Sequence, residues 1–163
     1  GRGEESIEAP TLTTEGVTRL SFDVCTLCRP FDDQRSLRIR METDAYYLAL
    51  QGVLRGRYRV VVSPVHFSEI RDIGDSKERL ELLALLRPFD ERKDWDLRSI
   101  RERAEDLASR KFGIADAAHV AFAEAGADVF LSCDDRLLKK CGSKGVRIPA
   151  MNPVGFCMRE DLR

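Results

Sequence analysis

Apolar and polar residues alternate along the chain in blocks that have the lengths of strands and helices. Apolar runs and strict alternations predict short strands over 19–25, 58–62, 129–131 and 146–148. A helical spacing of apolar or charged residues predicts helices over 37–54, 64–73, 77–87, 96–111, 115–125 and 136–140. Because strands alternate with helices, the pattern predicts an α/β fold with a central, mostly parallel sheet flanked by helices.

The stretch 113–135, GIADAAHVAFAEAGADVFLSCDD, combines three features of such a fold. Its alanines predict a helix that packs closely on a sheet, and Gly126 is a favoured stop for that helix. Val129, Phe130 and Leu131 then form an apolar strand, which Asp134 follows directly. Parallel α/β sheets place their ligand sites at the carboxyl ends of the strands. We therefore expect the ligand or active site of the protein near Asp134.

Composition and charge narrow the class of protein. The chain has 163 residues, 43% hydrophobic and 34% charged, which is typical of one soluble globular domain. We expect a flexible arm over 1–17 and the domain over 18–163. The net charge of −1 provides no strong field for nucleic acid, so a polyanion would need a local basic patch or metal ions.

Two further observations concern location. No apolar run approaches the roughly 20 residues that a membrane span requires, so no membrane association is expected. The five cysteines are an odd number without the spacing of a disulfide framework. That usage favours reduced thiols and a cytoplasmic protein.

Four acids stand beside apolar residues at comparable places in the predicted elements. Asp23 interrupts the first strand, Glu69 lies in the helix after the second strand, Asp116 is in the first turn of a helix, and Asp134 follows a strand. Clustered carboxylates repel one another unless cations compensate for their charge. Mg²⁺ and Mn²⁺ prefer oxygen ligands, and such ions with an activated water are the usual equipment for attack on a phosphodiester.

Each acid also has a purely structural interpretation. Asp23 could cap the end of a strand, and Glu69 could mark the boundary of an amphipathic helix face. Asp116 could interact only with the helix dipole. Asp134 and Asp135 compete for two roles, and we predict Asp134 as the ligand and Asp135 as the helix cap.

Several segments resemble a PIN-domain nuclease of the kind found among VapC-like toxins and their stand-alone relatives. They are the opening FDVCTLCRPFDDQ, the SEI triplet at Glu69, the GIADAAHVAFAEAGADVFLSCDD block and the closing RIPAMNPVGF. Together they span roughly residues 18 to 157, and the GIADAAHVA…LSCDD block is the most specific.

The resemblance implies a metal-dependent endoribonuclease that uses Mg²⁺ or Mn²⁺ and leaves 5′-phosphate and 3′-hydroxyl ends. It implies RNA as the substrate, and it raises an antitoxin partner and a homodimer as further expectations. The positions that match the family's acidic residues are Asp23, Glu69, Asp116 and Asp134, with Ser132 in a supporting place and Asp135 as an additional or outer ligand.

Other polar residues remain open between a functional and a structural role. Arg29, Arg35 and Arg38 could hold RNA phosphates or belong to a solvated face. His119 is expected to be packed rather than to act as a general base, and Glu42 on the first long helix is expected to be solvated.

Two alternatives to the nuclease hypothesis follow from the residues. The first is a PIN-like nucleic-acid or protein-binding module that keeps the acids but has no turnover. The second is a redox or zinc protein built on the pair Cys25 and Cys28, although neither the remaining cysteines nor the histidines supply a second ligand pair by spacing.

Overall fold

The structure is a computed structural model that describes residues 16–91 and 94–163, so most of the predicted arm over 1–17 lies outside the described residues. Within the described part, four parallel strands form one sheet in the order β2-β1-β3-β4, which confirms the predicted α/β class. The strands are β1 (Thr18–Phe22), β2 (Tyr58–Val60), β3 (Val129–Leu131) and β4 (Ala150–Met151). The helices are α1 (Val24–Cys28), α2 (Leu37–Leu54), α3 (Pro64–Arg71), α4 (Ser76–Leu86), α5 (Leu97–Ser109), α6 (Ile114–Gly126), α7 (Asp135–Ser143) and α8 (Pro153–Arg159).

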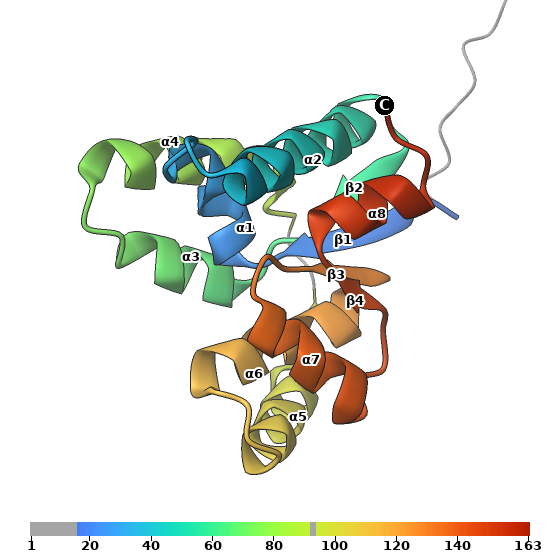
Figure 1. The fold of residues 1–163 in the computed structure, drawn as a ribbon. Helices are drawn as coiled ribbons and strands as arrows, with labels where there is room; N and C mark the ends of the chain where they lie inside the picture. The colour runs from blue at the N-terminus through green and yellow to red at the C-terminus, as the bar shows by residue number, and fades with distance from the viewer. Residues whose placement is uncertain (1–15, 92–93) are drawn as a thin grey trace, which may run out of the picture.

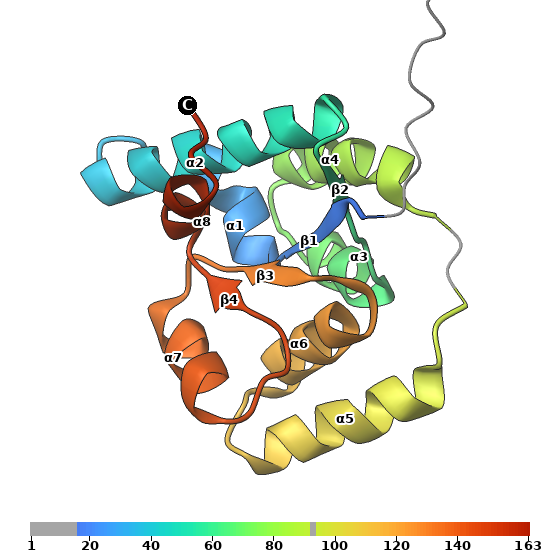
Figure 2. The same ribbon diagram turned by 90° about the vertical axis from the view of Figure 1, so that its right-hand side faces the viewer.

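Helices cover both faces of the sheet (Figures 1 and 2). In Figure 2, α2 and α8 lie above the sheet, and α5, α6 and α7 lie below it. Strand β3 separates the two apolar cores, because Val129 and Leu131 pack into the core under α2 and α8, while Phe130 packs into the core formed with α5, α6 and α7. The uninterrupted apolar run of β3 is therefore explained by burial on both faces, as the sequence predicted. None of the helices in the described part is both long and apolar enough to span a bilayer.

The first strand is shorter than the sequence predicts. Strand β1 ends at Phe22, and Asp23 begins helix α1 by accepting a hydrogen bond from the backbone N–H of Thr26. The alternation of Leu20, Phe22 and Val24 extends past the real strand because a short buried helix also needs an apolar Val24. The prediction of a strand over 23–25 was therefore wrong.

The last strand is also displaced. The predicted strand over 146–148 is instead β4 at Ala150–Met151, because the N–H groups of Phe130 and Ser132 donate to the carbonyls of Pro149 and Met151. Val146 and Ile148 are apolar for another reason, since they pack against the core of α5, α6 and α7. The segment after β4 forms α8, which places Phe156 in the other core.

A pair of glycine variants tests this packing. A Cβ atom at Gly52 in α2 would lie 2.6 Å from the buried ring of Tyr58, whereas one at Gly142 in α7 meets nothing within 4 Å. We expect Gly52→Ala to lower the free energy of unfolding by about 1–3 kcal/mol through overpacking. Gly142→Ala should raise it by up to about 1 kcal/mol through helix propensity. Denaturant unfolding measures both, and equal stability of the two variants would contradict this packing of α2 on β2.

Candidate active site

Asp23 joins the sheet to the first helix at the carboxyl end of β1. Its backbone N–H donates to the carbonyl of Leu131 at 3.0 Å, so the residue still pairs with the neighbouring strand. Its Oδ1 accepts from the backbone N–H of Thr26 at 3.0 Å and lies 2.6 Å from the Thr26 hydroxyl. The side chain is 6% exposed, so both the backbone and the carboxylate are fixed. The capping role considered for Asp23 is thus present, at a helix start rather than a strand end.

Ser132 links Asp23 to the segment that carries Asp134. Its buried hydroxyl donates to Asp23 Oδ2 at 2.5 Å and accepts from the backbone N–H of Asp134 at 3.0 Å. A hydroxyl can donate and accept at the same time, so Ser132 supports both acids. The structure thereby gives a physical basis to the supporting place predicted for Ser132.

Asp134 is the N-cap of α7, contrary to the prediction that Asp135 has this role. Its Oδ1 accepts from the backbone N–H groups of Arg136 and Leu137 at 3.0 and 3.2 Å. The extended backbone of Asp134 (φ −89°, ψ 104°) is the conformation an N-cap requires, whereas Asp135 already belongs to the helix. Asp135 instead forms an ion pair with Arg38 at 2.7 Å.

Asp116 lies in the first turn of α6 and is partly buried, and no hydrogen bond or ion pair joins its carboxylate to any residue that the structure describes. Burial raises the pKa of Asp116, and the negative charges of Asp134, Asp23 and Glu69 raise it further. Like charges affect one another in this way only when they are close. Asp116 therefore lies within electrostatic range of the other three acids predicted from the sequence.

Glu69 on α3 lies against a buried histidine. Its Oε2 lies 3.0 Å from Nε2 of His119, which is 3% exposed, and this contact lowers the pKa of Glu69 against the opposing effect of burial. His119 is thus packed, as predicted, and its position three residues after Asp116 places it on the same side of α6. It connects the helix that carries Asp116 to the side chain of Glu69.

A second histidine supports the first. The ring of His66 packs edge-on against His119, with 4.9 Å between centroids. The backbone N–H of Ser63 donates to His66 Nδ1 at 3.0 Å, so the ring proton is on Nε2, which donates to the carbonyl of Phe22 at 2.6 Å. Burial is the main reason that the pKa of His66 is lowered to about 4, and His66 is therefore neutral at pH 7. It ties α3 to the last residue of β1, next to Asp23.

The three arginines predicted to hold RNA all contact carboxylates of the protein. Arg29 pairs with Asp32 at 2.9 Å and Glu42 at 3.2 Å, and the exposed Arg35 pairs with its neighbour Asp33 at 2.8 Å. The contacts of Arg38 with Asp135 and Glu42 connect α2 to the segment before α7.

Glu42 is the residue that the sequence interpretation placed wrongly. It is 1% exposed rather than solvated, and its Oε1 contacts Arg29 and Arg38 while its Oε2 accepts from the side-chain amide of Asn152. Its helical spacing from the buried Ala45 and Ala49 was a signal that it lies on the inner face of α2. Nothing local in the sequence indicates the contact with Asn152.

Cys25 and Cys28 lie in α1, and all five cysteines of the chain are in the described residues and are free. The Cys25 thiol lies 3.1–3.2 Å from both carboxylate oxygens of Asp23. Burial, together with the Asp23 charge, raises the pKa of Cys25, and burial raises the pKa of Cys28 to about 12. Protonated thiols are poor nucleophiles, so these pKa values do not favour the redox alternative.

The candidate site therefore consists of Asp116, the three carboxylates whose charges act on it, and the side chains that contact those carboxylates. Within residues 16–91 and 94–163, no three or more His, Cys, Asp or Glu side chains already stand where they could hold a metal ion together. Comparison of the chain with protein-family models, with curated proteins and with solved structures finds no match. The chemistry of the site is therefore inferred from its own residues.

The buried, neutral state of His66 predicts a pH dependence of stability. In the unfolded chain His66 takes up a proton near pH 6.5, whereas in the folded protein it does so only near pH 4. The unfolded state thus binds more protons between these two pH values. The contribution of His66 to the free energy of unfolding is therefore complete above pH 6.5 and is lost as the pH falls to 4. We expect it to amount to about 3 kcal/mol.

The test compares the free energy of unfolding of the wild type and of His66→Gln between pH 7 and pH 4. Glutamine at this position can still reach back to the Ser63 N–H, as in a capping box. The wild type should lose more stability than the variant on acidification. Parallel pH profiles for the two proteins would show that His66 is not held neutral by burial.

Proposed function

We propose that this chain is a metal-dependent endoribonuclease with a PIN-like domain. The observation that carries the proposal is that the negative charges of Asp134, Asp23 and Glu69 all act on the partly buried Asp116, although the four acids come from separate places in the chain. Concentrating like charges in a partly buried place is costly without a function that uses them. Asp23 directly follows β1 and Asp134 follows β3, and the carboxyl ends of the strands are the usual place for a site in a parallel sheet.

The donor set suits the cation that the proposal requires. The four side chains offer only carboxylate oxygens, which are the ligands that Mg²⁺ and Mn²⁺ prefer. In the proposal these acids close on the cation, which neutralises their repulsion. When bound, such an ion lowers the pKa of a water molecule and stabilises charge on the phosphate during hydrolysis.

The acids have different surroundings, which suggests a division of roles. Asp23 is fixed by Thr26 and Ser132 and would provide the rigid reference point. Asp116 has the raised pKa and makes no hydrogen bond with a described residue, so a cation would relieve its charge most. His119 would keep the Glu69 carboxylate turned toward α6.

The RNA substrate, the Mg²⁺ or Mn²⁺ requirement and the 5′-phosphate products are proposed from the resemblance to PIN-domain nucleases together with this donor set. An antitoxin partner, a homodimer and a cytoplasmic location belong to the same proposal. With a net charge of −1, the protein would attract RNA through bound cations and local arginines rather than through its overall field.

The direct test is cleavage of labelled single-stranded RNA by the wild type and by Asp116→Asn, with Mn²⁺, with Mg²⁺ and with EDTA. We expect cleavage with either metal, none with EDTA, and a loss on the order of 100-fold or more in the variant. Because the Asp116 charge is disfavoured in the fold, the metal-free variant should be at least as stable as the wild type at pH 7.

Glu105→Gln provides the matched control, because Glu105 is an exposed acid on α5 whose one ion pair within residues 16–91 and 94–163 is with Arg101, one turn away. It should cleave as the wild type does. Full activity of a folded Asp116→Asn variant would refute the proposal. RNA binding without cleavage in every metal would instead support the binding module considered above.

A further inference from the structure

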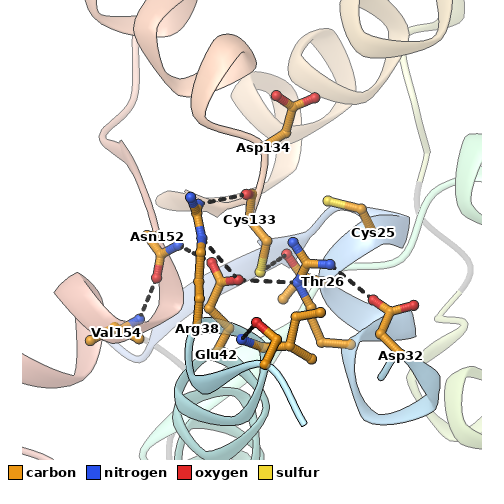
Figure 3. Close-up of polar contacts among 12 residues, drawn as sticks. Cys25, Thr26, Asp32, Arg38, Glu42, Cys133, Asp134, Asn152 and Val154 are labelled. Atoms are coloured by element: carbon orange, nitrogen blue, oxygen red, sulfur yellow. Dashed lines mark hydrogen bonds and ion pairs between the residues drawn. The ribbon is translucent and has the colours of Figure 1, made fainter. Parts of the chain in front are cut away.

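Arg38 bridges α2 and the segment that carries Asp134. Its Nη1 and Nη2 donate to the two oxygens of Asp135 at 2.7 and 2.8 Å, and Nη2 also donates to the backbone carbonyl of Cys133 at 3.3 Å. One guanidinium thus binds the residues on both sides of Asp134. Figure 3 shows Asp134 itself pointing away from Arg38, so the arginine holds its flanks and leaves its carboxylate available.

Glu42, one turn along α2 from Arg38, forms an ion pair with it. Its Oε1 lies 3.4 Å from Nε of Arg38 and 3.2 Å from Nε of Arg29, and its Oε2 accepts from the amide of Asn152. A buried carboxylate is costly unless it is paired, and here two cations and an amide surround it. With three donors directed at it, Glu42 has little freedom to move.

Asn152 extends this support to the next strand. Its Oδ1 accepts from the backbone N–H of Val154 at 2.8 Å and so caps α8 directly after β4. Its amide group reaches Glu42 from the other side (Figure 3). Helix α2, the segment 133–135 and the start of α8 are therefore fixed to one another through Glu42 and Arg38.

We propose that Arg38 and Glu42 are positioning residues that hold the segment 133–135 so that Asp134 faces the other three acids. We call these two residues the clamp. The inference rests on the proposed function, because it assigns the clamp to the same metal site. The clamp acts through the Asp135 carboxylate and the Cys133 carbonyl, and in this proposal it touches neither substrate nor metal.

The clamp differs from the phosphate-binding role that the sequence suggested for Arg38. In the structure, Nε, Nη1 and Nη2 of Arg38 each face a protein oxygen, so Asp135 competes with any RNA phosphate for this guanidinium. The two roles predict opposite effects of removing Asp135. A clamp loses its hold on the segment, whereas a phosphate-binding arginine is freed from a competitor.

The experiment uses Arg38→Gln and Asp135→Ala in the full chain. Mn²⁺ affinity is measured by calorimetry without RNA, and kcat and KM are measured for RNA cleavage. Both variants should bind Mn²⁺ about tenfold or more weakly and lower kcat, with KM nearly unchanged, as expected for lost support of a metal ligand. The double variant should behave like Arg38→Gln, because that variant already breaks the contact with Asp135 along with those to Cys133 and Glu42.

Arg19→Gln is the matched control. Arg19 and Asp128 form a two-pronged pair at 3.2 and 3.1 Å, similar to that of Arg38 and Asp135, but at the opposite end of β1 and β3. This variant should keep the Mn²⁺ affinity and kcat of the wild type. Hydrogen exchange adds a readout without metal: the backbone N–H groups of Asp134, Arg136 and Leu137 should exchange faster in the clamp variants only.

The outcomes separate the two claims. Unchanged hydrogen exchange and Mn²⁺ affinity in both clamp variants would overturn the clamp while leaving the nuclease proposal intact. A lower KM in Asp135→Ala with a higher KM in Arg38→Gln would also overturn it, in favour of direct RNA binding by Arg38. A wild type that neither binds Mn²⁺ nor cleaves RNA would refute the proposed function, and the clamp's assignment to a metal site would fall with it.

Discussion

The buried carboxylate of Asp23 is the constraint on which the arrangement of the site depends. Its backbone pairs with β3, its Oδ1 begins α1, and its Oδ2 receives the hydroxyl of Ser132, which also accepts from the Asp134 N–H. A buried charge is tolerated only when its hydrogen bonds are satisfied, so the end of β1, the start of α1 and the end of β3 must meet in one way. The other acids are then presented to Asp23 by elements that pack on this frame.

Repulsion among the acids is opposed by polar contacts to three of them. His119 lies against Glu69, backbone N–H groups cap Asp134, and a hydroxyl and a backbone N–H satisfy Asp23. Asp116 has no such contact with a described residue, and burial together with the neighbouring negative charges raises its pKa. In the proposed nuclease, a divalent cation would remove this repulsion. Repulsion among the carboxylates would thus lower the stability of the metal-free protein and favour binding of the cation.

The sequence pattern predicted the helices and strands whose formation depends mainly on neighbouring residues. The long helix α2, the Ser63–Pro64 start of α3 and the apolar strand β3 follow from helical spacing, capping and burial on both faces. Patterns failed where two elements need the same residue types: Val24 is apolar in a short helix as it would be in a strand, and Asp134 and Asp135 are equally good caps by type. The four acids could be proposed from their places after strands and in helices. The contacts of Glu42 with Asn152 and of Arg38 with Asp135 join residues about 100 positions apart, so only the folded chain reveals them.

The central claim is that Asp23, Glu69, Asp116 and Asp134 hold one cation site. The most direct measurement is a crystal structure of the full chain grown with Mn²⁺, in which anomalous scattering locates the metal without reference to the protein coordinates. The account predicts an anomalous peak among these four carboxylates, with ligand oxygens near the roughly 2.1 Å found for Mg²⁺ rather than at the longer distances of Ca²⁺. A peak elsewhere on the protein, or none near these four side chains at saturating Mn²⁺, would contradict it.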